Sequence, residues 1–256
     1  MEGKRILKFC ILHFTLVILI LFPLFVSADG IRDTKHNLSF KGTGTVKAVE
    51  ETQICIFCHT PHNSYPDYPL WNHDPSAAVS YTHYTSDTLQ SYKSEADAPP
   101  IDGVSKLCLS CHDGTIAVGA VKSRFDDIAM EISECINASG KLTRGTGCTG
   151  YIGTDLSGGH PISIVFDSIL VGRRNSSTTL CPLKPPPTRQ TEPYVRLYPT
   201  RGGYGVQCTS CHDPHTNRSM EIDEVTGNKW PPFWQKGSHD AVCLVCHVEC
   251  THEWPW

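Results

Sequence analysis

The sequence predicts one domain made mostly of loops, with short helices, little strand and a core organised around bound prosthetic groups. Three observations support this fold class. The 256 residues include 13 Cys and 13 His, a large excess, whereas the hydrophobic share of 39% is ordinary. Hydrophobic periodicity is weak along the chain, so long regular elements are not expected. One short pattern of Cys and His also occurs four times.

The repeated pattern is CxxCH, in which two cysteines are separated by two residues and followed directly by a histidine. About 0.03 such strings are expected by chance in a chain with these Cys and His frequencies, so four copies cannot be an accident of composition. The copies are Cys55, Cys58 and His59; Cys108, Cys111 and His112; Cys208, Cys211 and His212; and Cys243, Cys246 and His247.

This spacing suits covalent haem attachment. Two cysteines three residues apart lie on the same side of one helical turn, so both thiols can add to the vinyl groups of one haem. The following histidine then projects from that turn to bind the iron. Structural zinc is the alternative, but zinc does not require a histidine after every second cysteine. The sequence therefore predicts a multihaem c-type cytochrome with four haem c groups, whose porphyrins form much of the core.

The remaining histidines decide whether each iron is closed by a second protein ligand. Eight lie outside the motifs and the N-terminal segment: His36, His62, His73, His83, His160, His215, His239 and His252. This number permits two histidines on every iron, which is typical of electron carriers, whereas an open iron would indicate a haem enzyme. His62 and His215 each follow a motif histidine by three residues, with Pro between. They are too close along the chain to reach the far face of their own haem, so each should serve a neighbouring haem.

Isolated histidines in polar loops are usually solvated surface residues. We expect four of the eight to be such surface residues: His73, His83, His239 and His252. His73 and His239 are the best alternative ligands among them, because Trp71 and Trp234 lie nearby in the sequence and could pack on a haem face.

Residues 1–28 have the organisation of an export signal. A positive start is followed by an apolar run over residues 9–26 and by small residues at 26–28. An uncleaved membrane anchor is the alternative, because the apolar run is long enough to span a bilayer. We expect residues 29–256 to form a single tetrahaem domain in an oxidising compartment. Nucleic acid is not an expected partner, because the net charge is -4 and no basic run is present.

Four cysteines lie outside both the motifs and the export signal. Of their three possible pairings we favour Cys135 with Cys148, which closes a Gly-rich loop, and Cys181 with Cys250. Cys250 occupies the place that His62 and His215 have relative to their motifs, so a thiolate bond to an iron is the alternative for this residue.

Secondary structure is expected in short pieces. We predict helical turns at each CxxCH motif, an amphipathic helix over residues 126–135, and strand-like segments at 162–166 and 194–197. The proline run at 185–187 should be extended. Since so little regular structure cannot provide an ordinary core, the chain without haem should not fold.

Several segments together resemble a known family. KHNLS at 35–39, CIFCHTPHN at 55–63, CLSCHDGTIAVG at 108–119, GHPI at 159–162 and VQCTSCHDPH at 206–215 are similar to the outer-surface tetrahaem cytochromes of metal-reducing bacteria, of the outer-membrane cytochrome E type. Members of that family polymerise into extracellular filaments with a continuous chain of haems. Each iron is held by two histidines, and one axial histidine comes from the adjacent subunit.

The resemblance implies a specific ligand set. It makes His62 the histidine donated head-to-tail to a haem of the adjacent subunit, and it makes His36, His160 and His215 the other distal ligands. The implied function is electron transfer without substrate chemistry, in a protein at the cell surface or outside the cell, passing electrons to redox partner proteins or extracellular acceptors. A soluble periplasmic shuttle and a haem subunit of a reductase remain as alternatives. Both would carry the same four haems.

Overall fold

The computed structural model describes residues 30–66, 68–187, 195–216, 233–236 and 238–249. The predicted export signal at 1–28 lies outside these residues. Among the residues that are described, no helix is both long enough and apolar enough to cross a membrane.

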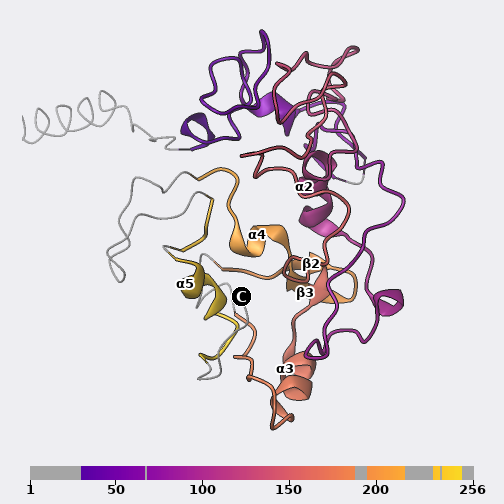
Figure 1. The fold of residues 1–256 in the computed structure, drawn as a ribbon, viewed down its shortest axis with the longest axis vertical. Helices are drawn as coiled ribbons and strands as arrows, with labels where there is room; N and C mark the ends of the chain where they lie inside the picture. Colours follow the sequence, from indigo (N-terminus) through magenta and orange to yellow (C-terminus); the bar gives the residue numbers. More distant parts are fainter. Residues whose placement is uncertain (1–29, 67, 188–194, 217–232, 237, 250–256) are drawn as a thin grey trace, which may run out of the picture.

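Helices are few and short (Figure 1). Four α-helices are described, and the longest has ten residues: α2 (Gly103–His112), α3 (Ser168–Asn175), α4 (Cys208–Cys211) and α5 (His239–Cys243). Three single 3-10 turns accompany them: η1 (Ile31–Asp33), η2 (Cys55–Phe57) and η3 (Glu95–Asp97). The side chain of Asp167 caps α3 by accepting a hydrogen bond from the Leu170 amide, and Ser238 caps α5 in the same way through Ala241.

One small antiparallel sheet lies beside α2. Its strands are β1 (Ile164–Val165), β2 (Tyr198–Thr200) and β3 (Gly203–Val206), in the order β1-β3-β2. β1 falls within the predicted strand-like segment at 162–166. β2 begins just after the predicted segment at 194–197, and it tolerates Pro199 because it is an edge strand. The central strand β3 has two glycines in four residues, which is why its sequence does not resemble a strand.

The apolar core is divided into two small clusters. One gathers around the first CxxCH motif, and its members include Phe57, Val118 and Ile136. The other joins the sheet to α3 and includes Ile164, Phe166 and Leu170, with Cys246 of the fourth motif packed against it. Each cluster therefore packs against one CxxCH motif, the first motif in one case and the fourth in the other.

The helix predicted over residues 126–135 is wrong. Ile128 and Met130 are buried while Ala129 between them is exposed, which is the alternation of an extended segment. The backbone here bonds to other segments: the Val49 amide donates to the Ala129 carbonyl at 2.9 Å, and the Ile128 amide donates to Gly119 at 2.9 Å. Pairing with distant backbone therefore replaced the helix that the apolar spacing suggested.

The predicted disulfide between Cys135 and Cys148 is present. Cys181 is also disulfide-bonded, and its predicted partner Cys250 lies outside the described residues.

Removing the Cys135–Cys148 bond should lower stability without affecting the CxxCH motifs. Closing a loop of about 15 residues stabilises a fold by about 3 kcal/mol. We expect replacement of both cysteines by Ser to lower the unfolding temperature by roughly 6–12 °C, followed by circular dichroism. Ser139→Ala, in the same exposed loop, should leave it unchanged, and equal melting of both proteins would contradict a stabilising role for the bond.

Candidate cofactor-binding site

The CxxCH motifs share one local conformation. In the first, third and fourth motifs the histidine amide donates to the carbonyl of the first cysteine, at 2.8 Å in His59, 3.0 Å in His212 and 2.9 Å in His247. The second motif forms the last turn of α2. An amide bonded four residues back defines a helical turn, which places both thiols and the imidazole on neighbouring faces.

The four motifs follow one another in space in their sequence order. Electrostatic contacts join Cys58 with Cys111, Cys108 with Cys208, and Cys211 with the two cysteines of the fourth motif. Burial and these contacts raise the pKa of Cys58 and of Cys211 to about 12. In Figure 1, α2, α4 and α5 follow the same order along one diagonal of the view. The motifs therefore form a row rather than a cluster.

Three motif histidines each face a second histidine from a distant segment. The ring centres of His112 and His36 are 5.9 Å apart, those of His59 and His215 are 5.9 Å apart, and those of His247 and His160 are 6.2 Å apart. The second members, His36, His215 and His160, are the three distal ligands that the family resemblance implies within one chain.

These separations fit an iron between the two rings. With nitrogen–metal bonds of about 2 Å and about 1.1 Å from ring centre to nitrogen, two imidazoles on opposite sides of one iron have centres about 6.2 Å apart. The residues present therefore fit a haem with two histidine ligands at the first, second and fourth motifs.

Hydrogen bonds leave the ligating nitrogen of several rings available. His112 Nδ1 lies 2.5 Å from the Gly150 carbonyl, and His160 Nδ1 lies 2.8 Å from the Pro161 carbonyl. A ring that donates from Nδ1 to a carbonyl presents the lone pair of Nε2 to a metal, and such bonds fix the orientation of metal-ligating histidines.

Burial favours the neutral imidazole that a metal requires. It lowers the pKa of His36 to about 4, with a further contribution from His112, and it lowers the pKa of His247 to about 4, with a contribution from His160. His215 differs, because the Asp213 carboxylate 3.6 Å from its Nδ1 raises its pKa.

The third motif has no second histidine ring against it within the described ranges. The His212 ring instead contacts Trp234, with centres 4.8 Å apart, and Trp234 contacts His239 at 4.5 Å. His62 is exposed, and its ring makes no hydrogen bond or ring contact to any described residue. Among the described residues, the motif histidine His212 therefore has no second histidine beside it, and the predicted distal ligand His62 has no motif histidine beside it. The two lie in different parts of the chain.

The expectation that His73 is a solvated surface residue is wrong. Its side chain is fully buried, with Nδ1 2.8 Å from the Asp74 carbonyl and Nε2 3.0 Å from the Ala117 carbonyl. Since both ring nitrogens are engaged, His73 has no free nitrogen for a metal and ties two loops together. His239 is exposed, His83 is half-buried beside Tyr92, and His252 lies outside the described residues.

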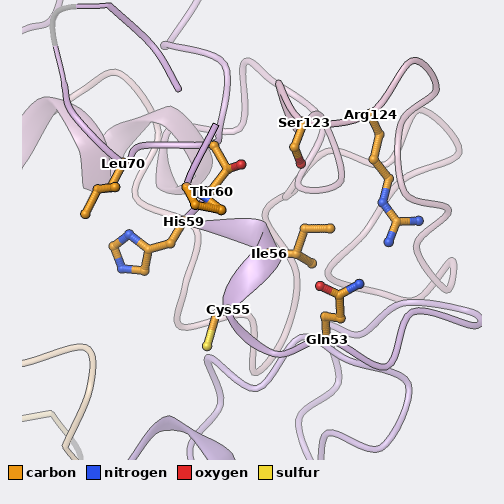
Figure 2. Close-up of a pocket in the computed structure, with 9 residues that line it drawn as sticks. Gln53, Cys55, Ile56, His59, Thr60, Leu70, Ser123 and Arg124 are labelled. Atoms are coloured by element: carbon orange, nitrogen blue, oxygen red, sulfur yellow. The ribbon is translucent and has the colours of Figure 1, made fainter. Parts of the chain in front are cut away.

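A pocket of about 550 Å³ lies beside the first motif. Cys55, His59 and Leu70 are among its lining residues, and Figure 2 shows the Cys55 thiol and the His59 ring on the side away from Arg124. Leu70 has a φ of 67°, an unfavourable conformation for this side chain, and its carbonyl accepts a hydrogen bond from Thr60. This hydrogen bond joins the two ends of the loop that follows the motif, at the edge of the pocket.

The zinc interpretation requires thiols gathered four at a time. Among the described residues, one group of three or more ligand atoms is close enough to hold a single ion, and it consists of Glu134, Cys135 and Cys148. The two sulfurs are joined in a disulfide, so they are not thiolates, and the group contains no motif cysteine.

Neither a comparison with protein-family models nor a comparison with curated protein sequences found a match for this chain.

Proposed function

We propose that this protein is an exported electron carrier with four covalently attached haems c, each iron held by two histidines. The observation that carries the proposal is the set of three histidine pairs at 5.9–6.2 Å, each joining a CxxCH histidine to a residue from a distant loop. The motif cysteines would form the thioether bonds. When bound, the haems supply a one-electron couple at each iron, and an iron closed on both faces has no position for substrate.

We further propose that the protein is a subunit of an extracellular filament. The His62 ring is exposed and makes no hydrogen bond or ring contact to a described residue. Among the described residues, the third motif is the one without a second histidine ring. A histidine donated from one copy to the third haem of the next would complete both. Such a head-to-tail contact does not close on itself, so it generates an open polymer. The row of motifs would then continue from one subunit to the next.

The first experiment tests the haems. The protein is expressed with its export signal in a host that attaches haem c, and the haem content is measured by pyridine haemochrome spectra after denaturation and solvent extraction. We expect four haems per chain that resist extraction. A colourless, zinc-containing protein would refute the proposal.

Single substitutions then test the ligand pairs. In His36→Ala, His160→Ala and His215→Ala, we expect about one quarter of the ferric haem to change from low spin to high spin, because one iron in four loses a ligand. His83→Ala is the matched control and should leave all four haems low-spin. A high-spin haem in the assembled wild-type protein would instead indicate an open iron and favour a haem enzyme.

A further inference from the structure

A buried carboxylate lies directly beside the histidine of the second motif. Asp113 follows His112 in the sequence, and only 3% of its surface is exposed. Carboxylates are rarely buried to this extent unless they are paired or fully hydrogen-bonded. Among the described residues, no Lys or Arg forms an ion pair with Asp113.

Four donors surround the two carboxylate oxygens. Oδ1 accepts from the Thr115 amide at 2.8 Å and from the Thr115 hydroxyl at 2.8 Å. Oδ2 accepts from the Tyr81 hydroxyl at 2.7 Å and from the Ser76 hydroxyl. An ionised carboxylate has about four acceptor sites and no proton to donate, so this shell matches the charged form. The Tyr81 phenol stays a donor, because burial raises its pKa.

The charge lies beside the motif itself. Asp113 is the C-cap residue of α2, and its backbone amide donates to the Leu109 carbonyl at 3.0 Å. Its backbone is thus continuous with the helical turn that carries Cys108, Cys111 and His112. The carboxylate is therefore close enough to influence a charge held at this motif.

The other motifs lack this arrangement. Thr60 and Val248 stand at the same position in the first and fourth motifs. Asp213 stands there in the third motif, but its side chain is 35% exposed and it contacts His215 at 3.6 Å. A buried carboxylate without a cationic partner is thus a feature of the second motif alone among the four.

We propose that Asp113 is a positioning residue that lowers the reduction potential of the haem held by Cys108, Cys111 and His112. The inference rests on the proposed function. Adding one electron to a ferric haem removes one positive charge, and a fixed negative charge in a low-dielectric environment stabilises the oxidised form. The Asp113 charge would thereby create a step in potential along the row of haems.

Replacement of Asp113 by Asn tests the proposal, because the amide keeps the shape and loses the charge. The four midpoint potentials are obtained by spectroelectrochemical titration of the haem bands of the holoprotein. We expect the reduction equilibrium of one of the four haems to change about tenfold in favour of the reduced form. This change raises its midpoint potential by about 59 mV, since one electron is transferred. Asp127→Asn removes an exposed charge and should shift none, since water and salt screen it.

A second variant separates charge from damage to the fold. Tyr81→Phe removes one donor while leaving the charge, so the less neutralised carboxylate should lower the same potential. The proposal thus predicts a higher potential in Asp113→Asn and a lower one in Tyr81→Phe. Damage to the loop would instead shift the potential in the same direction in both variants. Two shifts of the same sign, or unchanged potentials in a protein with four low-spin haems, would overturn this inference alone, whereas absence of covalent haem would overturn the proposed function.

Discussion

The His62→Ala variant is expected to lose filament assembly and to remain as single subunits with three low-spin haems and one high-spin haem. His62 is exposed and its ring makes no hydrogen bond or ring contact to a described residue, while His212 lies against Trp234 rather than a histidine. If the imidazole crosses between subunits, its removal deletes the bond that joins them and opens one iron at the same time. Electron microscopy and the high-spin absorption band measure the two effects.

Mixing two defective subunits distinguishes donation between chains from ligation within one chain. His62→Ala keeps the third haem but lacks the donor. A Cys208→Ala, Cys211→Ala variant keeps the donor but lacks the third haem. Donation between chains predicts that the two variants form a heterodimer, in which His62 of one subunit binds the third haem of the other. The high-spin signal is then lost, and the dimer cannot add further subunits because it has neither a free donor nor a free third haem. A soluble shuttle, in which His62 ligates within its own chain, predicts no pairing and an unchanged signal. Wild-type material found only as discrete particles would contradict the filament and leave electron transfer standing.

The chain without haem should fail to fold. In the part of the chain that the structure describes, the two apolar clusters contain eight and six buried residues. The longest helix there has ten residues, and the strands have two to four. Helices of this length are marginal on their own, and so small a core cannot offset the conformational entropy of a chain rich in loops. The three histidine pairs would also be left facing each other with no metal between them.

This prediction is measured on protein exported from cells that cannot attach haem. We expect no cooperative thermal transition and rapid digestion by trypsin, whereas the holoprotein should resist digestion and melt cooperatively. The Cys135→Ser, Cys148→Ser holoprotein is the matched control, because it keeps the haems and loses a crosslink. A cooperative transition in the haem-free chain would show that the apolar clusters suffice.

What the sequence could predict depended on the range of the interactions. The helical turns at the motifs follow from spacing alone, since a CxxCH string must bring residues three and four apart together. The Cys135–Cys148 bond could also be predicted, because its two cysteines are only 13 positions apart and enclose a Gly-rich loop. Long-range packing could not be predicted in this way. Met130 is in an extended segment because the backbone at Lys47 and Val49 bonds to the residues on either side of it, and no local pattern reveals that pairing.

The same limit applies to the site. Composition suggested that His73 was a surface residue, yet two carbonyls from separate loops enclose it. The sequence does not reveal that Asp113 is buried, because a single carboxylate after a motif is common. Its burial depends on Ser76 and Tyr81, more than thirty residues earlier. No local sequence signal distinguishes Asp113, because Thr60 and Asp213 are polar residues at the same position after the first and third motifs.

The three histidine pairs also constrain the order of events during synthesis. If the protein is exported from its N-terminus, as the proposed function requires, His36 and His112 are both available as soon as the second motif has emerged. His59 must wait for His215, and His160 must wait for His247. In the proposed cytochrome, the second haem site would therefore be completed first although it is second in the chain. The first motif would lack its second histidine until most of the protein had been exported.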